Sequence, residues 1–206
     1  MIIELVGPPA SGKTSLAKTL SERLGFPIVK ISGKNELLTL ASLFTVKHPL
    51  FAIKTLLLIV TESRSWSVFR TKILNTFLHH AAKYEKATKL EHAIIDEGHA
   101  QNFYSIFERP VPPRIFERYL EYIPRHVDML ILLATPKEVR EKRARERGYT
   151  ARERIASGVE MVAWGKAMEI NERVFIPLFP RLANRTFVVS SQADESTLLK
   201  KLSSEF

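Results

Sequence analysis

Short, continuous apolar runs alternate along the chain with longer stretches of helical periodicity. Such a run, bounded by glycine or polar residues, is typical of a strand that is buried on both faces. Five runs predict strands, at 2–6, 27–31, 92–96, 127–134 and 186–190. The remaining periodic stretches predict helices at 15–24, 35–86, 100–108, 113–122, 136–147, 151–175 and 194–202.

Strands separated by helices predict an α/β fold, in which a five-stranded parallel sheet carries helices on both faces. We expect one domain over residues 1–206, because no linker, repeat or low-complexity stretch interrupts the pattern. Ligands of such sheets bind at the carboxyl ends of the strands. That rule selects 7–15, 32–36, 96–101, Thr135 and 190–193 as the ligand-facing edge.

The longest apolar run, 50–60, lies within the extended helical region and is broken by Lys54. It is too short to span a bilayer, which takes about 20 apolar residues. We interpret it as a core helix, so that no transmembrane segment is expected. A helix lying on a membrane surface stays as the alternative, given the basic character of the chain.

Composition narrows the class of protein. The 206 residues are 45% hydrophobic and 26% charged, which is typical of a globular protein. The lack of cysteine excludes disulfides, thiolate zinc sites and cysteine nucleophiles, and it is compatible with a reducing compartment. The N-terminal residues have no basic region and no cleavage site of a signal peptide, so we expect a cytoplasmic protein.

The net charge of +9 favours an acidic partner. A phosphorylated small molecule would need local arginines, whereas nucleic acid would need a continuous basic face. A solvated basic surface is the third interpretation. Charge alone does not decide among these three interpretations, but its placement along the chain helps.

The first motif with a chemical meaning is Gly7-Pro-Pro-Ala-Ser-Gly-Lys-Thr14, which fits G-x-x-x-x-G-K-[ST] and lies between a predicted strand and a helix. Gly7 and Gly12 allow the backbone to wrap a phosphate. Because Pro8 and Pro9 have no N–H, the amides that bind phosphate must begin at Ala10 and continue through Ser11, Gly12, Lys13, Thr14 and Ser15. Lys13 is expected to reach the β- and γ-phosphates, and the Thr14 hydroxyl to coordinate Mg²⁺.

The second motif is Asp96-Glu97-Gly98, at the end of a predicted strand. An acid at this place, beside the first strand, organises magnesium in enzymes that transfer phosphoryl groups. We expect Asp96 to hold the ion. Glu97 would orient or deprotonate a nucleophile, unless it is an ordinary surface residue.

The third motif is the basic helix 136–147. Glu138 and Glu141 pair with Lys142 and Arg145 at i,i+4 spacing. Three arginines stay on one face without an acid, namely Arg140, Arg143 and Arg147. Since like charges repel, an anion between them is favourable, and the guanidinium fork suits phosphate oxygens. The alternative is a solvated charged helix. Arg152 and Arg154 extend this basic zone.

Together, these motifs resemble the P-loop nucleotide kinases, nearest the thymidylate kinase and deoxynucleoside kinase group. There, a strand is followed by a lid helix of the form P-E-x-x-x-x-R-x-x-x-R-G. Pro136, Arg143, Arg147 and Gly148 match it, with Glu138 displaced by one residue.

The resemblance implies a three-layer P-loop NTPase fold with a lid at 136–154, a helical acceptor-side insertion at 35–90, and ATP and Mg²⁺ as cofactors. The segment 188–194 is similar to the last strand and adenine-side loop of that group, which implies base contacts at Ser191 and Ala193.

The chain also departs from this group. Thymidylate kinases have Asp-Arg after the third strand and deoxynucleoside kinases have Glu-Arg-Ser, whereas this chain has Asp96-Glu97-Gly98-His99. Arg64 or Arg70 could replace the missing arginine, unless both are ordinary surface residues. Glu36 lies where nucleoside kinases place an acid that activates the acceptor.

Three hypotheses follow. The leading one is transfer of the ATP γ-phosphoryl group to a small acceptor, a nucleoside or nucleotide. The alternative is an ATPase or nucleotide-dependent switch that acts on a macromolecule, with Glu97 orienting water. A basic nucleic-acid-binding module is the least favoured, because the basic residues cluster at the predicted lid. The oligomeric state stays open, with a dimer among the options.

Overall fold

The computed structural model describes residues 1–124, 127–148, 158–190 and 192–204. Side chains of six further residues inside helices lie outside the description, namely Arg147, Val159, Glu160, Gln192, Ala193 and Ser203.

Within the described residues, the sheet has four parallel strands in the order β2-β1-β3-β4. They are β1 (Ile2–Val6), β2 (Ala93–Ile95), β3 (Met129–Leu133) and β4 (Arg185–Val189). β1 pairs with β2 through Glu4 opposite Ile95, and with β3 through Val6 opposite Leu132. The carboxyl ends of these strands therefore lie at one edge, and the α/β class is confirmed.

The predicted strand at 27–31 is wrong in extent, because the structure contains only an isolated parallel bridge there, between Ile28 and Ile94. The Val29 N–H donates to the Ile94 carbonyl, and the Ile94 N–H donates to the Pro27 carbonyl, each at 2.9 Å. Beyond this point the chain leaves the sheet, since the Ser32 N–H donates to the Glu36 carboxylate at 2.6 Å instead of to β2. The segment 27–31 therefore joins β2 through these two backbone hydrogen bonds and does not form the additional strand that was expected.

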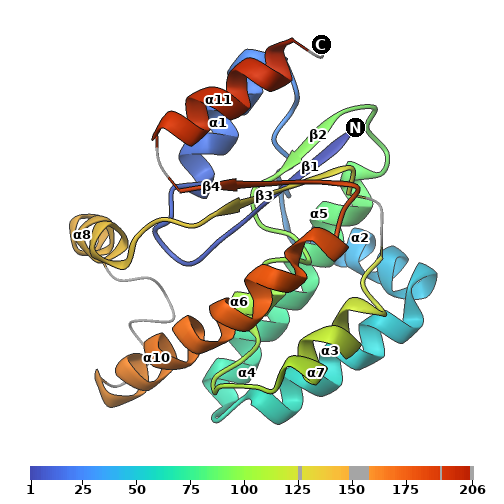
Figure 1. The fold of residues 1–206 in the computed structure, drawn as a ribbon. Helices are drawn as coiled ribbons and strands as arrows, with labels where there is room; N and C mark the ends of the chain where they lie inside the picture. The colour runs from blue at the N-terminus through green and yellow to red at the C-terminus, as the bar shows by residue number, and fades with distance from the viewer. Residues whose placement is uncertain (125–126, 149–157, 191, 205–206) are drawn as a thin grey trace.

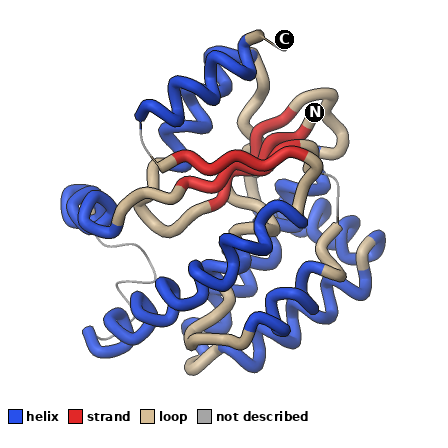
Figure 2. Tube along the Cα trace, viewed as in Figure 1, coloured by secondary structure: helices blue, strands red, loops and turns tan. Residues whose placement is uncertain are grey.

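Helices cover both faces of the sheet, which gives three layers (Figures 1 and 2). One face is covered by α1 (Lys13–Leu24) and α11 (Gln192–Ser203). The helices on the other side are α2 (Lys34–Lys47), α3 (Pro49–Glu62), α4 (Trp66–Lys72), α5 (His79–Ala87), α6 (Asn102–Ser105), α7 (Pro113–Leu120) and α10 (Gly158–Phe175). A π-helix, η1 (Ile73–Leu78), joins α4 to α5, and a 3-10 helix, η2 (Ile176–Arg181), follows α10. The predicted lid helix is α8 (Lys137–Arg147), which projects from the edge of the sheet.

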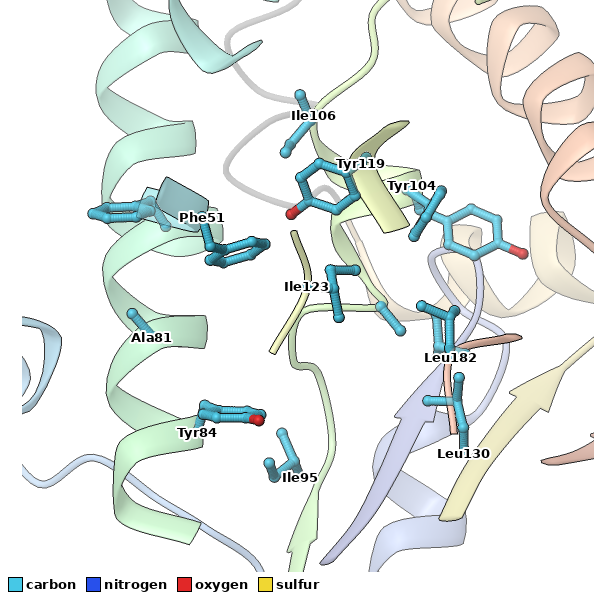
Figure 3. Packing of buried hydrophobic residues seen from close by; sticks show 14 of the residues in the cluster. Phe51, Ala81, Tyr84, Ile95, Tyr104, Ile106, Tyr119, Ile123, Leu130 and Leu182 are labelled. Atoms are coloured by element: carbon cyan, nitrogen blue, oxygen red, sulfur yellow. The ribbon is translucent and has the colours of Figure 1, made fainter. Parts of the chain in front are cut away.

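The alternation of side chains along β1 divides the core in two. Ile3 and Leu5 pack with α1 and α11, whereas Ile2 and Val6 face the larger cluster on the other side. Figure 3 shows that the larger cluster is rich in aromatic rings, among them Phe51, Tyr84, Tyr104 and Tyr119. Glu4 lies on the same side of β1 as Ile2 and Val6 and is only 2% exposed. It is an ionisable residue in one of the two inner strands of the sheet.

The apolar run 50–60 lies in α3 and is buried on one side only, which corrects the expectation of a core helix. Phe51, Ala52 and Ile59 are buried, whereas Leu50 is 65% exposed. Of the helices that the structure describes, none is by itself long and apolar enough to cross a membrane. Taken together, α2 and α3 reach that apolar length, but they are bent by 113°.

Replacing Phe103 by alanine is predicted to destabilise the fold strongly. Its ring stacks on Phe175 at a centroid distance of 4.3 Å and on Phe116 at 5.2 Å, so truncation leaves a cavity between α6, α7 and α10. We expect the free energy of unfolding to fall by about 3–5 kcal/mol in urea denaturation. Leu74→Ala is the control, because this side chain is 46% exposed and its loss costs below about 1 kcal/mol. Equal losses in both variants would contradict the packing described.

Candidate functional site

The loop between β1 and α1 is the first part of the site. A Cβ on Gly7 would lie 2.8 Å from the Leu133 carbonyl oxygen, so only glycine fits there. Further along, Ala10 and Gly12 have φ angles of 61° and 100°, in the left-handed region. Alternation between left- and right-handed conformations turns successive backbone N–H groups to one side and forms an anion-binding hollow. The loop therefore has the backbone geometry that the motif predicts.

Lys13 is buried inside this loop, with 6% of its surface exposed. Its Nζ donates to the carbonyl oxygens of Gly7 at 2.8 Å and Pro8 at 3.1 Å. The same Nζ lies 3.4 Å from the Glu97 Oε1. These contacts hold the ammonium group at the inner side of the loop, next to the second of the two acids that follow β2.

Ser11 joins the loop to the segment that follows β3. Its carbonyl accepts from the Thr135 hydroxyl at 2.8 Å and from Arg143 Nη1 at 3.1 Å. Its own hydroxyl is buried and has no hydrogen-bond partner among the described residues. An unsatisfied buried hydroxyl is costly, and an oxygen of a bound anion would satisfy it.

Two cavities open on either side of this loop and share Ser11, Gly12, Ser15 and Arg143. The first has a volume of about 410 Å³. Beyond the loop it is lined by Glu97, Gln101, Tyr104, Ser105, Arg143 and Trp164. The second has a volume of about 440 Å³ and lies between the ends of β3 and β4. Its lining includes Leu133, Thr135, Pro136, Val139, Val189, Ser190 and Glu195.

The two acids after β2 take different positions. Glu97 lines the first cavity, and its side chain is 47% exposed. Asp96 is not among the described residues that line either of these cavities, and its Oδ1 lies 2.5 Å from the Nζ of Lys83 on α5. The structure thus brings Lys13, Thr14 and Glu97 together around one cavity, with Asp96 held behind them by Lys83.

Glu4 and Gln101 fix the loop that carries these acids. The Ala100 N–H donates to the Glu4 carboxylate at 2.7 Å, and a Cβ on Gly98 would lie 2.7 Å from its carboxyl carbon. The Gly7 N–H donates to the Gln101 Oε1 at 3.1 Å. Burial raises the pKa of Glu4 to about 7, an effect that hydrogen bonds from the loop and the charge of Lys83 oppose.

The side chains of Arg140 and Arg143 on α8 do not converge on one site. Arg143 reaches the loop, but the Arg140 Nε donates to the Thr135 carbonyl at 3.0 Å. Arg140 is also 8% exposed and borders a separate surface hollow with Glu169 and Glu172. The side chain of Arg147 lies outside the description. So do Ser191, Arg152, Arg154 and the side chain of Ala193.

Other candidates lie away from both cavities. His99 is buried between the rings of Phe44, Phe51 and Tyr84, and burial holds its pKa well below the usual range. Glu36 forms an ion pair with Lys86 at 2.5 Å, and this hydrogen bond lowers the pKa of the Glu36 carboxyl. Arg64 Nη2 donates to the Glu108 carbonyl at 3.3 Å, and Arg70 is exposed. Neither arginine is among the described residues that line the two cavities.

Several site residues were missed by sequence reasoning. They are Glu4, Lys83, Gln101, Tyr104, Ser105 and Trp164. Gln101 had a usable signal, because the segment 96–101 was expected at the ligand-facing edge. Trp164 and Lys83 had none, since their positions depend on how α10 and α5 pack against the sheet.

The comparisons with known proteins agree with this geometry. The profile of a family described as an AAA domain matches residues 3–165. The chain therefore belongs to this family, and its fold is that of the P-loop kinases of nucleotides and small molecules.

Two solved structures illustrate the fold. The structure of deoxyadenosine kinase from M. mycoides with bound dATP has a TM-score of 0.60 at 18% identity, over 100% of this chain and 98% of the other. Shikimate kinase from Bacteroides thetaiotaomicron has a TM-score of 0.50 at 13% identity, over 98% of this chain and 96% of the other.

A curated relative matches only locally. The tRNA dimethylallyltransferase of Synechococcus sp. (strain CC9902) is 50% identical over 34 residues, which span 16% of this chain and 11% of that protein. So short a match carries no statement about substrate.

The buried carboxyl of Glu4 predicts a pH-dependent stability. Its folded-state pKa of about 7 lies above the value of 4.5 for an unburied group. Its contribution to stability is therefore present at low pH and is lost as pH rises through about 7. The free energy of unfolding of Glu4→Gln minus that of the natural protein should rise by about 2–3 kcal/mol between about pH 5 and about pH 8.

Urea titrations at several pH values measure this difference. Because the difference is taken at each pH, the titration of distant groups cancels to first order. Glu91→Gln is the matched control, since the Glu91 side chain is 91% exposed. A difference for Glu4→Gln that does not vary with pH would show that this carboxyl keeps an ordinary pKa.

Proposed function

We propose that the protein is a kinase that transfers the γ-phosphoryl group of Mg²⁺·ATP to a hydroxyl group of a small acceptor. The observation that carries this proposal is the contact between Lys13 and Glu97, 3.4 Å apart, in a cavity that continues beyond the phosphate-binding loop. A cation for the phosphates and a carboxylate for the nucleophile thus lie side by side in one cavity.

The two cavities give each reactant a place. The hollow between β3 and β4 takes the base, against Leu133, Val139 and Val189. The phosphates lie on the amides from Ala10 to Ser15 and beside the hydroxyl of Ser11. The acceptor enters the first cavity, where Tyr104, Ser105 and Trp164 offer aromatic surface and a hydroxyl group.

The residues present fit a magnesium ion. Thr14 and Glu97 offer a hydroxyl and a carboxylate to the same cavity, with Asp96 behind them. No cluster of three or more histidine or acidic ligands occurs in the described part of the chain. Mg²⁺ suits such a site, since it takes few protein ligands and binds phosphate oxygens and water. The ion would neutralise phosphate charge when bound.

The residues of this chain then act by position and charge. Lys13 holds the β- and γ-phosphates, and Glu97 accepts the proton of the attacking hydroxyl. The bond from the acceptor oxygen to phosphorus forms as the bond to the β–γ bridging oxygen breaks, and ADP leaves. Arg143, on the segment 136–154, neutralises the transferred group, and closure of that segment as a lid excludes water. The helical region 35–90 borders the acceptor side, within one domain of a cytoplasmic protein.

Production of ADP tests this function. Mg²⁺·ATP is incubated with and without a pool of nucleosides, nucleotides and sugars. Formation of ADP that depends on the pool supports a kinase, and division of the pool identifies the acceptor. Steady ADP formation without any acceptor would contradict the kinase and favour the ATPase alternative, with Glu97 orienting water.

Lys13→Ala is predicted to lower kcat by about 100-fold or more, because it removes the buried cation that faces the transferred charge. Lys18→Ala is the matched control, since Lys18 is exposed on the same helix. Steady-state ADP formation measures both variants. Unchanged turnover in Lys13→Ala would disprove the site.

Arg143→Ala is predicted to lower kcat by about 10- to 1,000-fold while the Kd for ATP changes by less than about fivefold, because the charge it neutralises develops during transfer. Arg145→Ala, an exposed arginine on the same helix, should behave like the natural protein. Calorimetric titration with a non-hydrolysable ATP analogue gives the Kd. A loss of ATP binding without a fall in kcat would assign Arg143 to nucleotide binding alone.

A further inference from the structure

The outer side of α3 carries a row of large apolar side chains. Leu50, Ile53, Leu57 and Val60 are 65%, 55%, 57% and 56% exposed. Their spacing of three, four and three residues places them on one side of the helix. Single exposed apolar residues are normal in a globular protein, but a contiguous row of them indicates a binding surface.

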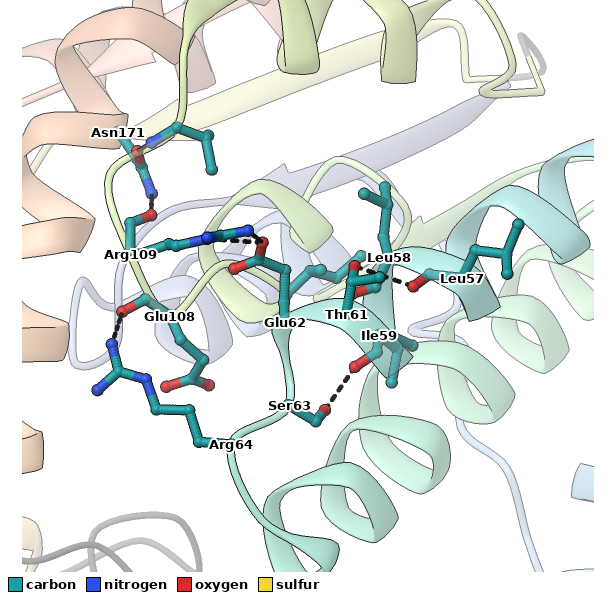
Figure 4. A network of polar contacts seen from close by, with 12 residues as sticks. Leu57, Leu58, Ile59, Thr61, Glu62, Ser63, Arg64, Glu108, Arg109 and Asn171 are labelled. Atoms are coloured by element: carbon teal, nitrogen blue, oxygen red, sulfur yellow. Dashed lines mark hydrogen bonds and ion pairs between the residues drawn. The ribbon is translucent and has the colours of Figure 1, made fainter.

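The helix is fixed in this orientation. Phe51, Ala52 and Ile59 on its other side are buried in the core. At its C-terminus, the buried Glu62 carboxylate accepts from Arg109 Nε at 3.1 Å and Nη2 at 2.9 Å, as Figure 4 shows. Rotating the row inward would expose the core side and break this ion pair, so the apolar row is a stable feature of the surface.

Further exposed apolar side chains lie close in sequence to both ends of the row. Val46, in the last turn of α2, is 77% exposed, and Trp66, at the start of α4, is 71% exposed. An indole ring combines apolar area with a polar N–H, and tryptophan is enriched at the boundary between membrane and water. The composition of the surface matches that boundary.

The charges on the segment that carries the row are mostly positive. The segment 34–72 contains six basic residues and two acidic ones. Both acids are paired within the protein, Glu36 with Lys86 at 2.5 Å and Glu62 with Arg109 at 2.9 Å. The exposed basic residues of the segment are Lys34, Lys47, Lys54, Arg64 and Arg70, of which Lys47 is paired with Glu85 at 2.6 Å. The partner that complements this surface is therefore apolar and negatively charged.

We propose that α3 binds the surface of a membrane that contains anionic lipids, with the row of Leu50, Ile53, Leu57 and Val60 in the interface and the surrounding basic residues on the lipid phosphates. An interfacial helix with an apolar face and flanking cations binds in this way. A second copy of this chain fits less well, because a two-fold contact would bring the cations of two molecules with charge +9 together.

The attachment leaves the nucleotide site accessible. In Figure 1, α3 and α8 lie on opposite sides of the molecule, and α8 carries Arg143 beside the phosphate-binding loop. A membrane bound at α3 therefore does not cover the cavity. The proposal stands independently of the function proposed above.

Vesicle flotation tests the proposal. The full chain is mixed with vesicles of phosphatidylcholine alone or with about one third phosphatidylglycerol. We expect binding to the anionic vesicles only, and a loss of at least about tenfold in the double variant Ile53→Glu, Leu57→Glu. Ile170→Glu is the matched control, since Ile170 is 46% exposed on α10. Circular dichroism verifies that each variant is folded.

Fluorescence gives a second readout that needs no change in α3. The chain has two tryptophans, so Trp164→Phe leaves Trp66 as the sole reporter. Its emission should shift to shorter wavelength on anionic vesicles and stay unchanged on neutral ones.

Three results would overturn the proposal. Undiminished flotation of the double variant would place the lipid contact elsewhere. A protein that binds neither kind of vesicle, but forms a dimer that the double variant dissociates, would assign the row to a second copy. Lack of vesicle binding by a monomer, with no shift of Trp66 emission, would leave the row without a lipid role.

Discussion

Parallel pairing of β1 with both β2 and β3 is the constraint on which the site depends. The register places Glu4 beside Ile95 and Val6 beside Leu132, so the three strands end together. The phosphate-binding loop, the acids after β2 and the segment after β3 therefore meet without a long connection. Gly7 lies so close to the Leu133 carbonyl oxygen that a Cβ at this position would clash with it, at 2.8 Å.

Glu4, which is buried inside this sheet, fixes the position of the loop that follows β2. The Glu4 carboxylate receives the backbone of the loop 98–100, and that loop positions Glu97 against Lys13 and Gln101 against Gly7. Burying a carboxyl costs stability, as its raised pKa indicates. The same arrangement holds the Lys13 ammonium group and the Glu97 carboxylate, which are both on flexible side chains, 3.4 Å apart. The polar side chains at this edge thus trade folding stability for a preorganised site, as is common where chemistry takes place.

The sequence predicted more of the fold than of the site. Strands β1 and β3 and the helices around them follow from apolar runs, and the phosphate-binding loop follows from a motif whose backbone geometry is local. The strand at 27–31 was overestimated, because an apolar run says nothing about whether the chain stays beside its neighbour. Lys83 and Trp164 could not be predicted as site residues either, because they reach the site through the packing of α5 and α10. The interpretation of 50–60 as a core helix was wrong because an apolar run does not say which of its residues face water, and only the alternative of a helix on a membrane surface allowed for the exposed side of α3.

The central claim is that phosphate moves from ATP to an organic hydroxyl group rather than to water. ³¹P NMR of a reaction with Mg²⁺·ATP and the active pool of acceptors distinguishes the two outcomes directly. The account predicts a new phosphomonoester resonance that grows in step with ADP and is missing with Lys13→Ala. Inorganic phosphate growing in step with ADP, with no phosphomonoester formed, would contradict it.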